Sequence, residues 1–270
     1  MLSGANPLNL NYWPLATFNQ WAVGFLDIFY IRDIILFGVG TVTPRSLSFK
    51  SKIAKIYSKY FWRKILNKEF THAVRDKESV ELLNILGLKN VKNLGCPSMW
   101  KLTHNHIRYI PKNKSDIVVT TLNSKYPSKE DFLLIKILSE KYREIYFWPQ
   151  GYTDICYFKK IVQKMNIPMK LIPPNLRAYD EFLDTYDVDY VGLRVHGGIR
   201  ALQHKKRTLI IAIDHRALSW YRDFGLPAIS RSKISILQDI IDQPLHVDLR
   251  IPESEIKEFL TNFRRYVIEK

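Results

Sequence analysis

The sequence predicts an α/β protein with parallel sheets, and two observations support this fold class. Short apolar runs typical of buried strands alternate along the chain with segments whose apolar residues recur at helical spacing. Polar residues or glycines follow several of these apolar runs at their carboxyl ends, where open parallel sheets place their ligands. Such alternation indicates parallel sheets with helices on both faces.

The composition is that of a globular protein with an anionic partner. The 270 residues are 46% hydrophobic and 13% aromatic, enough for a core in one large or two moderate domains. The net charge of +15 and the pI of about 9.6 favour phosphorylated small molecules, an acidic membrane surface or nucleic acid as partners. A solvated basic surface is the alternative. No nucleic-acid-binding module is recognised, so we expect no nucleic acid partner.

Cysteine usage and hydropathy indicate a cytoplasmic protein. Cys96 and Cys156 are far apart and do not form a metal-binding pattern, so we expect a reducing compartment. No basic segment precedes an apolar run at the N-terminus, so no signal peptide is predicted. The longest apolar stretch, residues 21–39, contains three charged residues and is predicted to be core rather than a membrane span.

The first elements of the chain are an irregular segment and a strand. Residues 1–20 are polar and aromatic and contain prolines, which predicts irregular structure. An apolar strand at 34–37 follows and runs into Gly38 and Gly40. Glycines at a strand end let the backbone approach a ligand, and they are equally typical of a tight turn. We therefore include both glycines among the residues expected at a cleft.

Residues 46–66 form a predicted basic, amphipathic helix. Its apolar residues fall at helical spacing with lysines and arginines between them. One interpretation is a surface helix whose apolar face lies in the core. The other is a surface that contacts an anionic membrane, because basic and aromatic residues alternate there.

Arg75 lies where a predicted strand meets a predicted helix. The strand spans 70–74, and the helix follows with Asp76 as its N-cap and Gly87 just after its C-terminus. A strand end beside a helix N-terminus favours anion binding. Arg75 is therefore a candidate donor-binding residue.

The rest of the chain continues the strand–helix alternation. A capping box is predicted at Ser128–Asp131. We expect domains at 1–110 and 111–252 and a closing helix at 253–270. The further predicted strands are 117–121, 145–148, 169–172, 190–193 and 209–213, and the further helices are 132–142, 158–165, 179–184 and 199–205.

The strand at 190–193 leads into the main candidate site. It ends at Arg194 and His196, with Gly197 and Gly198 behind them. Alternate residues of an extended chain point to one side, so we expect Arg194 and His196 to share a pocket. The glycines would expose backbone N–H groups to an anion at the start of a helix.

Neighbouring strand ends add further candidates for the same cleft. His215 and Arg216 follow the strand at 209–213, and Gln150 and Asp154 follow the strand at 145–148. No metal is expected. Asp187 and Asp189 precede a strand instead of following it, and the pair of histidines at 104 and 106 lacks a third ligand.

Two segments resemble a known family. D-Y-V-G-L-R-V-H-G-G at 189–198 and V-R-D-K-E-S at 74–79, with the Leu-Gly that closes the following helix, are similar to motifs of the polysaccharide pyruvyl transferases. Val195 stands where the family usually has leucine. Two of three usual glycines are present near position 38, and Gly95-Cys96-Pro97 lacks the family's acidic residue. No G-N-x-G-D-like loop opens the chain, so a shortened N-terminal domain is expected.

The resemblance implies two Rossmann-like domains in a GT-B-like architecture. It implies transfer of a pyruvyl group from phosphoenolpyruvate to a sugar of a surface polysaccharide, such as a capsule or exopolysaccharide, without a cofactor. Arg194 and Arg75 would bind the donor, and His196 would move a proton. His215 and Arg216 would hold the departing phosphate.

Two alternative functions fit the same residues. A GT-B glycosyltransferase would use the arginine and histidine to bind the diphosphate of a nucleotide sugar. A non-catalytic member of a polysaccharide assembly complex would tolerate a shortened N-terminal domain. For the transferase we expect a sugar or a lipid-linked oligosaccharide as acceptor, and peripheral contact with the inner face of an anionic membrane.

Overall fold

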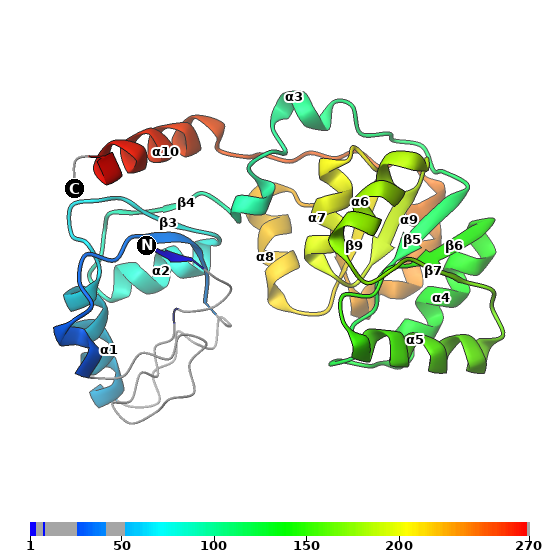
Figure 1. The fold of residues 1–270 in the computed structure, drawn as a ribbon, viewed down its shortest axis with the longest axis horizontal. Helices are drawn as coiled ribbons and strands as arrows, with labels where there is room; N and C mark the ends of the chain where they lie inside the picture. The colour runs from blue at the N-terminus through cyan, green and yellow to red at the C-terminus, as the bar shows by residue number, and fades with distance from the viewer. Residues whose placement is uncertain (4–7, 9–25, 42–51, 269–270) are drawn as a thin grey trace. The chain divides into compact units, whose positions relative to one another are not determined.

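The computed structural model describes residues 1–3, 8, 26–41 and 52–268 (Figure 1). The chain divides into two compact units. Unit 1 comprises Met1–Trp100 with Ile251–Lys270, and unit 2 comprises Lys101–Arg250. Each unit contains a parallel sheet, so the predicted α/β class with parallel sheets is confirmed. No helix in the described part of the chain has both the length and the apolar character needed to cross a membrane.

Unit 1 is built on a four-stranded parallel sheet with the strand order β1-β2-β3-β4. The prediction of an irregular segment over 1–20 is wrong at its start, where two residues pair in parallel with β2. Apart from residues 1–3 and Leu8, that segment lies outside the described residues. The strands are β1 (Leu2–Ser3), β2 (Leu36–Val39), β3 (His72–Val74) and β4 (Val91–Asn93).

Helices cover both faces of the unit 1 sheet. On one face, α1 (Lys52–Ile65) and α2 (Lys77–Ile85) share a core with Leu36 and Val39. On the other face, α10 (Glu253–Ile268) packs Phe259 against Phe37, with ring centroids 5.5 Å apart. The predicted closing helix therefore completes the core of the N-terminal sheet.

Gly38 explains how β2 serves both cores. Its φ of 66° lies in the left-handed region, and the pairing of β2 with β3 changes register between Phe37 and Val39. Leu36 and Val39, three residues apart, therefore reach the same core, while Phe37 points to the other. An added Cβ on Gly38 would lie 2.3 Å from Cδ of Pro97.

The predicted start and stop signals of α2 are confirmed. The side chain of Asp76 accepts a hydrogen bond from the backbone N of Ser79 at 2.8 Å, as an N-cap does. Gly87 follows the helix with a φ of 86°. A short 3-10 helix, η1 (Leu26–Phe29), lies between β1 and β2 in the chain, and another, η3 (Pro97–Met99), follows β4.

Unit 2 is built on a six-stranded parallel sheet with the order β10-β9-β8-β5-β6-β7. The chain runs outward from β5 to β7, returns to β8 on the other side of β5, and continues to β10. The boundary between β5 and β8 is thus a topological switch point, where ligands bind in open α/β sheets. The strands are β5 (Ile117–Thr120), β6 (Glu144–Phe147), β7 (Lys170–Leu171), β8 (Asp189–Gly192), β9 (Thr208–Ala212) and β10 (Ala228–Ser230).

Helices lie on both sides of this sheet (Figure 1). On one face, α4, α5 and α9 share a core with Val118, Val191 and Leu209. The intervening strand residues Tyr190 and Ile210 point to the opposite face, toward α7. The helices and turns are α3 (His104–Ile107), α4 (Lys129–Lys141), α5 (Tyr152–Met165), α6 (Leu176–Thr185), α7 (Val195–Gln203), α8 (His215–Phe224), η4 (Arg231–Ile236) and α9 (Leu237–Asp242).

All four helices that the sequence predicts in unit 2 begin earlier than expected, by three residues in α4 and α6 and by more in α5 and α7. The helix α5 begins at Tyr152 rather than at 158, and α7 begins at Val195 rather than at 199. Glycine has a low helix propensity, and this explains why the sequence does not signal the first turn of α7. The predicted capping box before α4 is confirmed.

A buried histidine predicts a pH-dependent stability. His72 is fully buried at the start of β3; its Nδ1 accepts from the backbone N of Leu36 at 3.2 Å, and its Nε2 lies 2.8 Å from the carbonyl of Asn67. Burial lowers the pKa of His72, which outweighs the opposite effect of the Asn67 carbonyl. Below the ordinary histidine pKa of about 6.5, the unfolded chain therefore takes up a proton that the folded chain refuses.

We expect the free energy of unfolding to fall as the pH drops below about 6.5, by up to about 1.4 kcal/mol per pH unit until the folded-state pKa is reached. Urea unfolding between pH 7.5 and pH 5 measures this, with His72→Gln as the comparison. An unchanged slope in the variant would assign the pH dependence to other groups.

Candidate active site

A pocket of about 110 Å³ lies at the carboxyl edge of the unit 2 sheet. Its walls follow the ends of β5, β6, β8 and β9, so it spans the switch point between β5 and β8. The first turns of α7 and α8 both contribute to it. The lining residues are Asn123, Gln150, Leu193, Arg194, Val195, His196, Ala212, Ile213, Asp214, Arg216 and Ala217.

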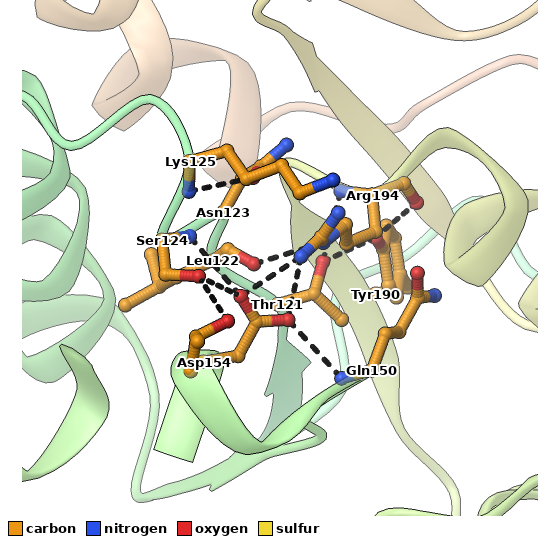
Figure 2. Close-up of polar contacts among 10 residues, drawn as sticks. Thr121, Leu122, Asn123, Ser124, Lys125, Gln150, Asp154, Tyr190 and Arg194 are labelled. Atoms are coloured by element: carbon orange, nitrogen blue, oxygen red, sulfur yellow. Dashed lines mark hydrogen bonds and ion pairs between the residues drawn. The ribbon is translucent and has the colours of Figure 1, made fainter. Parts of the chain in front are cut away.

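Arg194 is held rigidly at one side of the pocket. Its Nη2 donates to both carboxylate oxygens of Asp154, at 2.8 and 2.6 Å, and its Nε donates to the carbonyl of Leu122 at 3.1 Å (Figure 2). The side chain is 22% exposed. Nη1 makes no hydrogen bond to any residue that the structure describes, so two N–H groups remain for a ligand.

Asp154 is the anchor of this arrangement. Its side chain has no exposed surface, and it also accepts hydrogen bonds from the backbone N and the Oγ of Ser124 and from the backbone N of Gln150. Burial alone would raise the pKa of Asp154, but the hydrogen bonds from Ser124 and Arg194 outweigh it and hold the pKa below its usual value. The carboxylate therefore stays ionised and fixes the guanidinium.

The backbone of Arg194 is fixed as well. Its N–H donates to Oγ1 of Thr121 at 3.0 Å, and its carbonyl accepts from the hydroxyl of Tyr190 at 2.7 Å. Oγ1 of Thr121 and the Tyr190 hydroxyl are 2.7 Å apart. Because the Tyr190 hydroxyl gives its proton to the carbonyl, Thr121 must donate in that contact. The strand β8 thus delivers Arg194, the N-cap of α7, in one defined conformation.

The glycines of α7 serve close packing. An added Cβ on Gly198 would lie 2.5 Å from Cγ1 of Ile210, and one on Gly197 would lie 3.1 Å from the Tyr190 hydroxyl. The N–H of Gly198 donates to the carbonyl of Arg194 inside the helix. The expectation that the Gly198 N–H is open to an anion is therefore wrong, because α7 begins earlier than predicted. Gly197 is buried and does not line the pocket.

His196 lies in the first turn of α7 and is exposed. Its ring meets that of Trp220 edge to face, with centroids 6.0 Å apart. Arg194 and His196 do not alternate along an extended chain as predicted, because His196 is helical. Both residues nevertheless line the same pocket.

Arg216 and His215 begin α8 on the next strand end. Arg216 donates from Nε and Nη2 to Asp214, the N-cap of α8, at 3.0 and 2.6 Å. Burial alone would raise the pKa of Asp214. The hydrogen bonds and charge of Arg216 outweigh burial and hold the pKa below its usual value. Both guanidinium groups of the pocket are therefore paired with carboxylates. His215 is half-buried and is not among the lining residues.

The other predicted site residues belong to unit 1. Arg75 is 2% exposed, and its Nε lies 3.4 Å from Asp76. An added Cβ on Gly40 would lie 2.1 Å from that same Nε, so Gly40 makes room for the arginine. Gly38 makes room for Pro97 in the same way. Donor binding by Arg75 stays a prediction.

Asp189 and His106, one from each pair considered above as possible metal ligands, have hydrogen-bond partners within the protein. Asp189 accepts from Arg207 at 2.6 Å and from the hydroxyl of Tyr142 at 2.8 Å, all deep in unit 2. Nε2 of His106 lies 2.8 Å from the carbonyl of Leu202. Within the described residues, no three His, Cys, Asp or Glu side chains gather into a group that could hold a metal ion.

Several residues that build the site are not among those predicted from the sequence. Thr121, Asn123 and Ser124 follow β5, and Asp214 precedes Arg216. The signal was present, because these polar residues come directly after apolar strands, as Arg194 does. The sequence does not indicate the role of Tyr190, because a tyrosine in an apolar strand is typical of any buried strand.

The packing of α7 predicts a destabilising effect of Gly198→Ala. Glycine to alanine in a helix normally gains about 0.5–1 kcal/mol. Here the new methyl group would meet Ile210, and overpacking of this kind costs about 1–3 kcal/mol. We expect a lower free energy of unfolding in urea. A gain in stability would show that α7 moves away from β9 at little cost.

Asp154→Asn should destabilise unit 2 by about 1.5–3 kcal/mol, since hydrogen bonds to a charged group are lost and Arg194 is left without a counter-charge. Chemical unfolding measures the change. Asp116→Asn is the matched control, because its side chain is exposed, and it should stay within about 0.5 kcal/mol of wild type. Equal effects of the two substitutions would contradict the anchoring role of Asp154.

Comparison with protein families agrees with the motifs. The family model of the polysaccharide pyruvyl transferases matches residues 3–215, which include both motifs and the loops that carry Arg194, His196 and Asp154. A comparison with curated proteins found no match. The family match covers well over half of the chain and ends where α8 begins. This chain belongs to the polysaccharide pyruvyl transferase family.

Proposed function

We propose that the chain transfers a pyruvyl group from phosphoenolpyruvate to a sugar of a surface polysaccharide, in the cytoplasm and without a cofactor. The observation that carries the proposal is the joint placement of Arg194 and His196 on one pocket at the switch point of the sheet. Membership in a transferase family whose group is pyruvyl supports the reaction class.

The donor carries a carboxylate and a phosphate, and the pocket offers donors for both. Nη1 of Arg194 and Nη1 of Arg216 have no hydrogen-bond partner among the described residues. The other guanidinium nitrogens donate to Asp154 and the carbonyl of Leu122 in Arg194, and to Asp214 in Arg216. The N-termini of α7 and α8 open into the pocket and add positive potential. A small pocket favours this small donor over a nucleotide sugar.

The ion pairs Arg194–Asp154 and Arg216–Asp214 determine how the two guanidinium groups could bind an anion. Each guanidinium is balanced by a carboxylate behind it, so neither needs a bound anion to be stable. Each also keeps a fixed orientation, so little reorganisation is required when charge develops on the substrate. The proposed pocket therefore works by oriented N–H groups and helix N-termini rather than by a large excess of positive charge.

The chemistry requires three proton movements, and an imidazole at this position can assist them. Protonation of the donor at C3 makes C2 electrophilic, and a sugar hydroxyl attacks C2 and loses its proton. The bond between C2 and the phosphate oxygen then breaks, phosphate leaves, and a second hydroxyl attacks C2 and loses its proton to close the ketal. His196 is exposed and lines the pocket, and an imidazole can both accept and donate a proton, so it is the proposed proton carrier.

His196→Ala should lower kcat by about 10²–10⁴-fold, because the proposed proton carrier is lost, and should leave the unfolding midpoint close to that of wild type, because the imidazole is exposed. Release of inorganic phosphate from phosphoenolpyruvate, with a galactoside or N-acetylmannosamine acceptor, measures the rate. His246→Ala is the control, since His246 is exposed elsewhere in unit 2.

A wild-type rate in His196→Ala would remove the proton-transfer role. Release of a nucleoside diphosphate from a nucleotide sugar, with no phosphate from phosphoenolpyruvate, would overturn the proposed reaction. Asp154→Asn separates positioning from folding, because at a temperature where the variant is folded its KM for phosphoenolpyruvate should rise.

A further inference from the structure

More than half of the excess positive charge lies in one short stretch of sequence. Residues 34–68 contain eight lysines and arginines and no aspartate or glutamate, a net charge of +8 out of +15 for the chain. The basic residues are Arg45, Lys50, Lys52, Lys55, Lys59, Arg63, Lys64 and Lys68. Residues 42–51 lie outside the described part of the chain, so the surface is argued from α1 onward.

The outer face of α1 mixes cations with exposed apolar side chains. Ile56 is 70% exposed and Tyr60 is 52% exposed, although Phe61 and Trp62 on the inner face are fully buried. Lys59 and Arg63 are exposed on the same outer face, because positions 56, 59, 60 and 63 recur at helical spacing. An isoleucine that is exposed between two cations has no role in the core of unit 1.

The same cations border a hollow at the closing turn of α2. This hollow has a volume of about 380 Å³, and no acidic residue lines it. Gly87 connects it to α1, because an added Cβ there would lie 3.6 Å from Nη1 of Arg63 and 3.6 Å from Cε of Lys59. Its lining residues are Arg63, Lys68, Gly87, Leu88, Lys89 and Asn90.

Structural roles do not account for this charge. Cations near the C-terminus of α2 do offset its dipole, but that dipole is equivalent to only about half an elementary charge. Lys59, Arg63, Lys68 and Lys89 form no ion pair with any residue that the structure describes, and all four are exposed. Their charge is therefore available to a partner.

We infer that this surface docks on an anionic phospholipid bilayer. We call it the α1 surface and define it by Ile56, Lys59, Tyr60, Arg63, Lys68 and Lys89. The cations would bind lipid phosphates, with the hollow around Lys68 and Lys89 receiving a headgroup. Ile56 and Tyr60 would enter the boundary between headgroups and acyl chains. A nucleic acid would satisfy the cations but leave Ile56 in water.

Cosedimentation of the full chain with vesicles tests the inference, which does not depend on the proposed reaction. We expect binding to vesicles that contain phosphatidylglycerol and none to pure phosphatidylcholine. Raising the salt from about 0.1 M to about 1 M shortens the Debye length from about 10 Å to about 3 Å and should release most of the protein.

Lys59→Gln/Arg63→Gln should weaken binding to anionic vesicles by roughly 25-fold, since each cation near such a surface contributes about fivefold. Lys159→Gln/Lys160→Gln on α5 is the matched control, with the same loss of charge at exposed positions of unit 2, and should bind as wild type does. Ile56→Ser/Tyr60→Ser should remove the fraction that resists salt. Lys68→Gln/Lys89→Gln tests the hollow independently of α1.

Three results would overturn the inference. One is failure of the wild-type chain to bind anionic vesicles at low salt. Another is an equal loss in the Lys159/Lys160 control, which would assign binding to net charge alone. The third is preferential binding of the α1 surface to an oligonucleotide, with vesicles unable to compete.

Discussion

The ion pair between Arg194 and Asp154 organises the pocket of unit 2, because it joins three loops that leave three different strands. Arg194 follows β8, Asp154 lies in the turn after β6, and Ser124 and Leu122 after β5 complete the contacts (Figure 2). A carboxylate with no exposed surface is tolerated only when hydrogen bonds replace its water, and these loops supply them. The relative positions of the three strand ends are therefore fixed by one charged contact.

The consequence for ligand binding is a pocket that is polar without being strongly charged. Arg194 donates from Nη2 to Asp154, and Arg216 donates from Nε and Nη2 to Asp214. Arg194, Arg216 and the first turns of α7 and α8 all line this pocket. Under the proposed function, such a site would recognise an anion by direction as much as by charge, which suits a donor with two differently shaped anionic groups.

Which features can be predicted from the sequence depends on how far apart in the chain the interacting residues lie. The cap of α2 at Asp76 and the capping box at Ser128 were predictable, because their partners lie within three residues. The first turn of α7 was not, since Gly197 and Gly198 lower its helix propensity and only packing against Tyr190 and Ile210 explains them. The pairing of Arg194 with Asp154 spans 40 residues and depends on the strand order, which local patterns do not encode.

The net charge of the chain likewise does not show which surface binds an anion. A charge of +15 suggests a cationic cleft for a small anion, yet the guanidinium groups of the pocket are paired with carboxylates. Lys59, Arg63, Lys68 and Lys89, on α1 and near the turn after α2 in the other unit, have no such partner among the described residues. A paired guanidinium adds little to the long-range field and an unpaired lysine adds its full charge, so residues 34–68, with eight cations and no acidic residue, form a concentrated source of that field. If both proposals hold, the basic stretch of unit 1 would serve attachment to an extended anionic surface, while donor recognition would rely on the short-range geometry of α7, α8 and their caps.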